Sequence, residues 1–119
     1  MELGNEGLVE ANLTIPQSTS LGFDLVVVDD VGDPVDLTGS DIHMRFQYHG
    51  KKIDIDRVMD HCCSYVDGAI KVFVPGTETA TMPVGTFNWD IIVDTALGES
   101  VRICYGDVRI IDTYAKDEV

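Results

Sequence analysis

Basic side chains are scarce in this sequence. The 119 residues contain 8 Lys and Arg against 21 Asp and Glu, which gives a formal net charge of -13. Proteins that bind nucleic acid through its phosphates gain affinity from clustered cations that release counterions, and anionic lipid surfaces attract the same cations. The composition therefore excludes phosphate-driven nucleic-acid binding and disfavours binding to an anionic membrane.

Long apolar runs and a disulfide framework are also missing. The longest apolar run in the first half covers residues 25–28, far below the ~20 residues that cross a bilayer. The first residues lack the basic and then apolar regions of a signal peptide, so we expect synthesis and folding in a cytoplasm. The 3 Cys are an odd number, and Cys62 and Cys63 are adjacent while Cys104 is distant. This pattern is unlike a disulfide framework.

The length predicts one domain over residues 1–119, because the chain is shorter than the ~150 residues that a single domain commonly has. Hydrophobic residues make up 45% and charged residues 24% of the chain, which is ordinary for a globular protein with one core. A chain of this size buries roughly two-thirds of its unfolded surface. This leaves little room for a deep enclosed cleft and counts against an enzyme with a large cavity.

Period-two alternation of apolar residues predicts strands through most of the chain, because successive side chains of a strand point to opposite faces. The alternating sets are Phe23, Leu25 and Val27; Ile42, Met44, Phe46 and Tyr48; Ile70, Val72 and Val74; Phe87, Trp89, Ile91 and Val93; and Val101, Ile103 and Tyr105. Turn signals separate them at residues 31–34, 49–50, 67–68, 75–76, 83–85 and 97–98. The pattern predicts an all-β fold: a two-layer antiparallel β-sandwich, Ig-like or jelly-roll-like, with about seven strands and a short helix left open.

Local features refine this prediction. Residues 94–99 fit the loop of a hairpin, with Gly98 available for a positive φ. Residues 13–15 add an N-terminal edge strand that ends at a proline. Gly106 interrupts the last strand, as a β-bulge or a close backbone approach would. Residues 54–66 fit both strand and a helix of one to three turns, and both alternatives stay open.

Four acidic residues lie in or beside one turn. Asp29, Asp30, Asp33 and Asp36 supply the hard oxygen ligands that Ca²⁺ takes. Their spacing departs from the Asp-x-Asp-x-Asp-Gly calcium loop, and no bidentate Glu follows. The Gly-Asp-Pro sequence among them is ordinary turn chemistry. We therefore interpret residues 29–36 as a solvated hairpin turn, with metal binding as the less favoured alternative.

Thiols and an imidazole offer a second candidate metal site. His61, Cys62, Cys63 and Cys104 carry ligand types that Zn²⁺ accepts. Adjacent Cys62 and Cys63 point in opposite directions on a strand, whereas structural zinc sites separate paired ligands by two to four residues. A Cys nucleophile with His61 as base needs an orienting group and an oxyanion hole, and the sequence signals neither. Packing as small hydrophobic side chains is the favoured interpretation of the cysteines.

The remaining chemistry-bearing residues have structural interpretations. His43 and His49 fall on the strand face opposite Met44 and Phe46, and we interpret them as exposed polar positions. Trp89 lies in the most regular alternating run, which favours a core anchor over a ligand platform. The chain has no phosphate-cradling Gly-rich motif, nucleophile elbow or metalloprotease helix. No catalytic, cofactor-binding or metal-ligating residue is assigned, no cofactor is expected, and the protein is predicted not to be an enzyme.

Three stretches share their order with a known family. They are DVGDPVDLTG at residues 30–39 followed by IHMRF at residues 42–46, TMPVGTFNWDI at residues 81–91, and VRICYGDVRI at residues 101–110. This order resembles a small β-sandwich module of tailed-bacteriophage structural proteins, such as the N-terminal domain of baseplate upper proteins and related tail or fibre components. The resemblance covers most of residues 20–111, but residues 54–66 are richer in Cys than the usual module.

The resemblance implies an architectural function. It implies a non-enzymatic virion protein, made in the host cytoplasm, that assembles in the tail, baseplate or fibre-attachment region. Its partners would be copies of itself and other phage structural proteins, without direct nucleic-acid or membrane contact. Sandwich edges and two flexible arms, residues 1–13 and 114–119, are the expected contact surfaces. Capsid decoration or a head-to-tail connector is an alternative within that class, and an acidic carbohydrate- or Ca²⁺-binding β-sandwich module is the alternative from another class.

Overall fold

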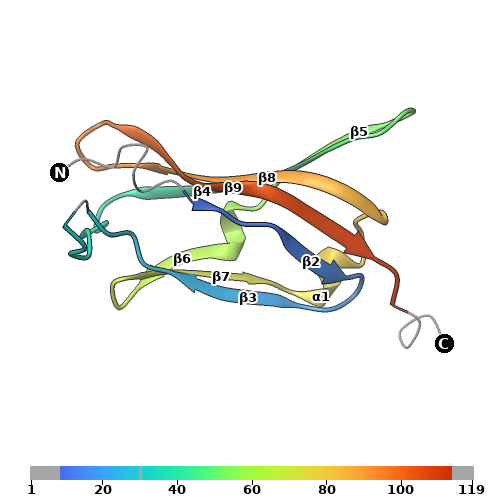
Figure 1. Cartoon of the computed structure of the whole chain (residues 1–119), viewed down its shortest axis with the longest axis horizontal. Helices are drawn as coiled ribbons and strands as arrows, with labels where there is room; N and C mark the ends of the chain where they lie inside the picture. The colour runs from blue at the N-terminus through green and yellow to red at the C-terminus, as the bar shows by residue number, and fades with distance from the viewer. Residues whose placement is uncertain (1–8, 30, 114–119) are drawn as a thin grey trace.

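The strands of the computed structural model form two sheets that pack face to face (Figure 1). The structure describes residues 9–29 and 31–113. The large sheet contains β1 (Val9–Glu10), β2 (Leu13–Pro16), β4 (Asp41–His49), β5 (Asp54–Val58), β8 (Gly85–Asp94) and β9 (Ser100–Ile111). The small sheet contains β3 (Leu21–Leu25), β6 (Cys63–Val66) and β7 (Ala69–Val74). The predicted all-β, two-layer sandwich is confirmed.

The order of strands within each sheet identifies the topology. The large sheet runs β1-β9-β8-β4-β5, with β2 also on β9, and the small sheet runs β3-β7-β6. In immunoglobulin variable-type sandwiches, strands G, F, C and C′ lie in one sheet and B, E and D in the other. Taken in chain order, β3 to β9 match B, C, C′, D, E, F and G. Of the two forms that the sequence left open, this order is the Ig-like one.

Two details of the sheets differ from the prediction. The described residues form nine strands rather than about seven, because the N-terminal segment and residues 54–66 each contribute two short ones. The large sheet is also not wholly antiparallel. Both β1 and β2 pair in parallel with β9, with Val9 opposite Cys104 and Leu13 opposite Val108. Alternation within a strand places its two faces but carries no information about the direction of its partner.

The two predicted arms fall only partly within the described residues. The arm at residues 114–119 lies outside them, as do residues 1–8 of the arm at 1–13. The rest of the N-terminal arm contains β1 and the first residue of β2, both of which pair with β9. The predicted edge strand at residues 13–15 is confirmed as β2.

An aromatic cluster joins the two sheets at the centre of the core. Trp89 on β8 packs edge-to-face against Phe23 on β3, with ring centroids 5.9 Å apart, and against Phe46 on β4 at 6.3 Å. Its indole Nε1 donates a 2.8 Å hydrogen bond to the carbonyl of Ala11. Trp89 is only 3% exposed, so its predicted core role is confirmed. Antibody domains join strands B and F with a disulfide, whereas here Phe23 and Trp89 supply the contact between those two strands.

The hairpin that joins β8 and β9 is confirmed. Its loop is closed by a 2.7 Å hydrogen bond from the backbone N–H of Thr95 to the carbonyl of Glu99. Gly98 adopts a φ of 89°, the left-handed conformation that the sequence assigned to it and that glycine takes at low cost.

The last strand contains a β-bulge, but the predicted position of the bulge is wrong. The register of β9 against β8 shifts at Ile103, three residues before Gly106. Both Ile103 and Cys104 are consequently buried, and Tyr105 is turned to the outer face. An isolated glycine marks a break in a strand only loosely, whereas two consecutive core-facing side chains, Ile103 and Cys104, mark this one.

Gly106 serves the other purpose that the sequence allowed, a close backbone approach. A Cβ atom at this position would lie 2.1 Å from the carbonyl oxygen of Ala11, a separation that no side chain tolerates. The absence of a side chain therefore lets the N-terminal segment lie directly against β9.

Residues 54–66, left open between helix and strand, contain both. β5 is followed by η2 (Asp60–Cys62), one turn of 3₁₀-helix, and then by β6. This crossover takes the chain from the large sheet to the small one. The helix α1 (Gly76–Thr79) returns it from β7 to β8, at a place where the sequence indicated only a turn, because one helical turn is too short to show a 3.6-residue period. Neither helix in the described residues has the length and apolar character of a bilayer span.

Candidate functional site

In the acidic turn at residues 29–36, the carboxylates of Asp29 and Asp36 accept hydrogen bonds within the turn. Asp29 Oδ1 accepts hydrogen bonds from the backbone N–H of Val31 at 3.1 Å and of Asp33 at 2.9 Å. Asp36 Oδ1 accepts from the hydroxyl and the backbone N–H of Thr38 at 2.6 and 3.0 Å, and these bonds hold the pKa of Asp36 below its ordinary value. Both arrangements are local turn structures and support the interpretation as a hairpin turn. Asp30 lies outside the described residues.

The zinc ligand set considered from the sequence is not assembled. Cys62, Cys63 and Cys104 are all free thiols. Cys104 is buried on β9, as predicted for a cysteine that packs as a small hydrophobic side chain. Burial, with smaller contributions from Cys62 and Asp60, raises the pKa of Cys63 to about 12. A thiol with so high a pKa is not activated as a nucleophile.

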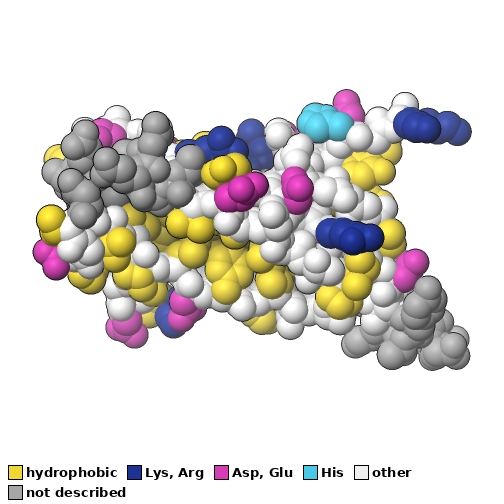
Figure 2. Space-filling view, in the orientation of Figure 1, with side chains coloured by type: hydrophobic (Ala, Val, Ile, Leu, Met, Phe, Trp, Pro, Cys, Tyr) yellow, Lys and Arg dark blue, Asp and Glu magenta, His cyan; other side chains and the backbone are white. Residues whose placement is uncertain are grey.

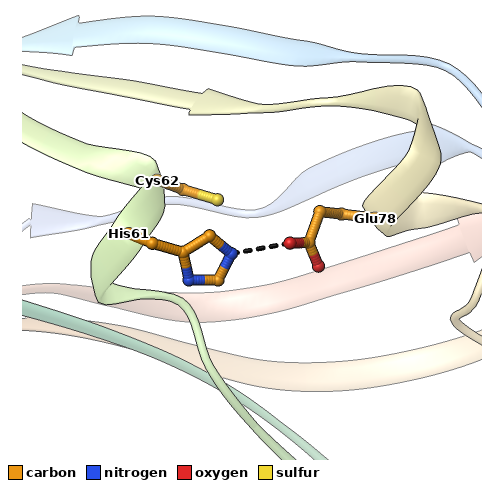
Figure 3. Close-up of side chains that lie close together, drawn as sticks. All are labelled: His61, Cys62 and Glu78. Carbon is orange, nitrogen blue, oxygen red and sulfur yellow. Dashed lines mark hydrogen bonds and ion pairs between the residues drawn. The ribbon is translucent and has the colours of Figure 1, made fainter.

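His61 and Cys62 instead lie beside Glu78, which comes from the other crossover (Figure 3). His61 Nε2 and Glu78 Oε1 are 2.6 Å apart. The ligand atoms of all three residues lie within 4.8 Å of one another. Figure 3 shows the Cys62 side chain pointing from η2 toward Glu78 on α1. This His61–Cys62–Glu78 cluster offers one nitrogen, one sulfur and carboxylate oxygens.

Glu78 is held in place by the local structure of α1. The helix follows Pro75, whose extended backbone has φ -70° and ψ 155°, and the backbone N–H of Glu78 donates to the Pro75 carbonyl at 2.9 Å. The next residue, Thr79, is fully buried and its hydroxyl donates to the Thr19 carbonyl at 2.8 Å. These bonds fix α1 against the segment before β3 and turn Glu78 toward η2.

Sequence reasoning missed Glu78 as a partner of His61. The two residues are 17 positions apart, and no motif with that spacing relates them. An isolated acid beside a predicted turn is typical of solvent-exposed loops, so nothing in its surroundings marks it. Because β6 and β7 pair as antiparallel neighbours, η2 before β6 lies beside α1 after β7. This arrangement brings Glu78 to His61.

Arg57 on β5 flanks the cluster. Its guanidinium donates to the hydroxyl of Thr81 at 2.8 Å and to the Thr81 carbonyl at 3.1 Å. It also lies 3.9 Å from Glu78 Oε2. Glu78 therefore directs one oxygen to His61 and the other to Arg57. The fixed positive charge of Arg57 opposes a further cation at this place.

A second histidine cluster lies on the outer face of the large sheet. His43 Nδ1 is 2.8 Å from Asp60 Oδ2, and His43 Nε2 is 3.0 Å from Asp94 Oδ2. Neutral imidazole donates from only one nitrogen, so the protonated ring is the form that satisfies both carboxylates. Asp60 Oδ1 also accepts the backbone N–H of Met44 at 3.1 Å. His43 is half exposed, in line with the sequence interpretation, but its pairing on both sides was not foreseen.

The pKa values in this His43–Asp60–Asp94 cluster shift in the directions that favour the charged forms. The hydrogen bond with Asp60 is the largest cause that raises the pKa of His43. Burial opposes ionisation of Asp60, but the hydrogen bonds from His43 and the Met44 amide lower its pKa overall. The hydroxyl of Ser100, and then His43, lower the pKa of Asp94. The cluster therefore favours an imidazolium between two carboxylates more than isolated side chains would.

The second cluster borders an open hollow of about 710 Å³ on the outer face of the large sheet. Arg102 Nε is 3.5 Å from Asp90 Oδ2, and the Arg102 guanidinium carbon lies 4.6 Å from the centre of the Tyr105 ring. The side-chain amides of Gln47 and Asn88 complete a mostly polar lining. The hollow suits contact with a polar surface or a polar ligand.

Comparison with known proteins gives weak structural likenesses. No family model and no curated protein sequence matches the chain. A solved structure titled "Structure-based site-directed photo-crosslinking analyses of multimeric cell-adhesive interactions of VGSC beta subunits" has a TM-score of 0.42 and 9% identity, over 95% of this chain and 98% of that chain. The "Crystal structure of Dscam1 isoform 4.4, N-terminal four Ig domains" has a TM-score of 0.38 and 12% identity, over 86% of this chain and 22% of that chain. Both TM-scores are too low to support an argument. The Ig-like topology is therefore assigned from the strand order alone, and any function must be inferred from the residues of this chain.

Proposed function

We propose that this chain is a non-enzymatic structural protein of a tailed-bacteriophage virion, which assembles through protein–protein contacts in the tail, baseplate or fibre-attachment region. The residues that resemble the phage module support the proposal by their position. Two of the three stretches occupy β8 and β9, at the centre of the large sheet. In the remaining stretch, at residues 30–46, Pro34 forms a β-bridge with Val28, and Leu37 is 1% exposed. The resemblance is thus carried by the framework of the sandwich.

Free strand edges support assembly through protein contacts. Among the described residues, β5 pairs with β4 alone, and β3 and β6 each pair with β7 alone. Their outer edges present backbone N–H and C=O groups to which another chain can add a strand. Figure 1 shows β5 projecting beyond the body of the sandwich, so this edge is the most accessible of the three.

The hairpin of β4 and β5 is the feature that most strongly supports assembly through protein contacts. Ile53 in its turn is 61% exposed and Val58 at the end of β5 is 53% exposed. The same turn contains Lys51 and Lys52 in a chain whose net charge is -13, and Figure 2 shows basic side chains at this projecting tip. A basic and partly apolar tip complements the acidic body of another copy. This favours a homo-oligomer in the virion.

Quantitative mass spectrometry of purified phage particles tests the proposal. We expect the chain in a fixed, stoichiometric number of copies. Ile53→Asp should lower incorporation about tenfold, because it removes an apolar contact and weakens the positive tip. Leu97→Asp, a matched change at a residue that is 75% exposed on the β8–β9 loop, should be incorporated normally. Absence of the wild-type chain from particles would contradict the virion role, and equal incorporation of the two variants would contradict the role of the hairpin.

The location within the particle has a second candidate, capsid decoration or a head-to-tail connector. Strand edges suit these positions equally well. Electron microscopy of the particle separates the alternatives, because it gives the position, the symmetry and the neighbours of each copy together.

The hollow on the outer face of the large sheet supports a candidate from another class, an acidic carbohydrate-binding module. Ligand sites combine an aromatic surface with a few placed polar groups, and Tyr105, Asn88 and Asp90 are of these types. Binding of Ca²⁺ through the loops is less favoured, because the Asp29 and Asp36 carboxylates already accept hydrogen bonds within their turn. An NMR titration with neutral oligosaccharides tests this candidate: shifts confined to the residues of β4, β8 and β9 that line the hollow would support it, and no shift at millimolar sugar would remove it.

A further inference from the structure

The two crossovers between the sheets meet at the His61–Cys62–Glu78 cluster, and we propose that this cluster is a binding site for a thiophilic divalent cation, with Zn²⁺ as the best fit. η2 brings the chain from the large sheet to the small one, and α1 takes it back. A cation bound by residues of both elements would cross-link the two connections between the sheets. This inference goes beyond the virion role and does not depend on it.

The objection to zinc that the sequence raised does not apply to this set. That objection concerned Cys62 and Cys63 as neighbours on a strand, where successive side chains point in opposite directions. His61 and Cys62 lie instead on a turn of 3₁₀-helix, in which three residues complete a turn and consecutive side chains diverge by only ~120°. Two adjacent ligands can then converge on one ion, and Glu78 replaces Cys63 and Cys104 as the further ligand.

The distances leave room for an ion after small side-chain movements. Zinc bonds are ~2.0–2.3 Å long, which puts the ligand atoms of a tetrahedral site roughly 3.3–3.8 Å apart. In the metal-free cluster the ligand atoms lie within 4.8 Å, and the closest pair, His61 Nε2 and Glu78 Oε1, is 2.6 Å apart. If an ion binds both atoms, the distance between them must increase by about 1 Å. Both side chains reach solvent, with exposed fractions of 56% and 27%, so they are free to make this adjustment.

The donor set selects the class of cation. Ca²⁺ and Mg²⁺ take oxygen ligands almost exclusively, whereas one thiolate, one imidazole and one carboxylate suit Zn²⁺ and its softer analogues. Three protein ligands leave the fourth position to water or to a group from a partner. Because the Cys62 thiol is only 7% exposed, the ion lies with its sulfur side toward the core and its open side toward solvent.

Binding requires that the Cys62 thiol lose its proton. An ordinary thiol with no metal bound carries its proton near pH 7. On binding, the S–H bond breaks, the sulfur keeps the electron pair and donates it to the cation, and the proton passes to the buffer. The hydrogen bond between His61 and Glu78 is lost in the same step. Metal binding therefore releases one proton from the thiol.

Titration of the metal-free full chain with Co²⁺ and then Zn²⁺ tests the site. We expect one equivalent of Co²⁺ to produce the near-ultraviolet absorption of a thiolate–cobalt bond, and Zn²⁺ to displace it. Zinc at a hundred times its Kd should raise the Tm by roughly 10 °C, because only the folded chain contains the site. Isothermal titration calorimetry in two buffers of different ionisation enthalpy counts the released proton.

Matched variants separate this site from loose binding to an acidic surface. Cys62→Ser should abolish the cobalt band, and Glu78→Gln should weaken zinc binding at least tenfold, while Cys63→Ser and Glu99→Gln should change neither. Arg57→Gln should tighten binding several-fold, because it removes a positive charge beside the ion. Glu78→Gln is the safeguard against a variant that fails to fold, since it keeps the shape of a partly exposed side chain.

Three results would overturn the proposal. The first is the absence of a thiolate–cobalt band at millimolar Co²⁺. The second is a band that survives Cys62→Ser but disappears in Cys63→Ser. The third is zinc binding that Glu78→Gln and Glu99→Gln affect equally, which would assign the bound ion to scattered carboxylates.

Discussion

The two histidine clusters each include a residue of η2, Asp60 in one and His61 in the other, but they differ in how their charges are paired. On the outer face, Asp60 and Asp94 hold His43 between them, and Asp60 also accepts a backbone N–H. On the other side, His61 is hydrogen-bonded to Glu78 next to the buried Cys62 thiol. The first cluster satisfies its own charges, so it stabilises the fold without a ligand. In the second, His61 and Glu78 pair with each other beside the uncharged Cys62 thiol, so a cation that binds all three side chains adds interactions that the metal-free cluster lacks.

The largest difference between the clusters should appear when one acid is removed from each in the presence of a metal chelator. Asp60→Ala should lower the free energy of unfolding by about 2 kcal/mol, because it leaves the Met44 N–H without an acceptor and His43 with one carboxylate. Glu78→Ala should cost only about 0.5 kcal/mol, since partly exposed ion pairs contribute little. Urea denaturation of both variants measures the two values.

A matched variant shows which part of Asp60 matters. Asp60→Asn keeps an oxygen that accepts the Met44 N–H but removes the charge that faces His43, so it should lie between wild type and Asp60→Ala. Equal losses for Asp60→Ala and Glu78→Ala would mean that the two clusters do not differ in the way described.

The pH dependence of stability should come from the outer cluster. The pKa of His43 is raised above its ordinary value of 6.5, so its contribution is complete below that pH and is lost as pH rises through the folded-state pKa. The pKa values of Asp60 and Asp94 are lowered below 3.8, so their contribution is present above that pH and is lost as pH falls through their folded-state values. The contribution of the cluster to stability is therefore greatest between about pH 4 and 6.5.

Urea midpoints of wild type and His43→Gln across pH 4–9 check this window. The variant should lose the decline above pH 6.5, because Gln has no titrating group, and NMR titration of the wild-type imidazole should give a pKa above the ordinary value. A His43 that titrates below 6.5 would show that the two carboxylates do not hold it as a cation.

The smallest effect should follow replacement of His61 without metal. His61→Gln keeps a side chain that can donate to Glu78, and the histidine is more than half exposed, so the loss in unfolding free energy should stay below about 0.5 kcal/mol. The same change should weaken zinc binding at least tenfold. A large loss of stability in the presence of chelator would show that His61 belongs to a structural pair rather than to an open ligand set.

The strands could be predicted from the sequence because each has one face in the core. Met44 and Phe46 on β4, and Trp89 on β8, alternate with polar residues along strands that are buried on one side only. The parallel pairing of β1 and β2 with β9, and the bulge at Ile103, could not be predicted in the same way. They depend on which strands lie side by side, and the alternation of a single strand does not carry that information.

The candidate site was predictable only in part, for a related reason. His61 and Cys62 could be singled out as ligand types, and Asp29 and Asp36 could be recognised as turn residues. Glu78 reaches the site through the folding of two crossovers onto one another, which no local pattern records. Likewise, the pairing of His43 with Asp60 and Asp94 joins three separate segments of the chain.

The hydrogen bond from Trp89 to Ala11 links the fluorescence of the tryptophan to the position of the N-terminal strands. Trp89 is the 1 Trp of the chain, and its indole N–H is satisfied by a residue between β1 and β2. Peeling the N-terminal strands away would leave that donor buried without an acceptor, next to the gap that Gly106 keeps open for them. The fluorescence of Trp89 should therefore report whether the N-terminal strands pair with β9, and a shortened form of the chain must keep residues 9–16 to retain this pairing and this hydrogen bond.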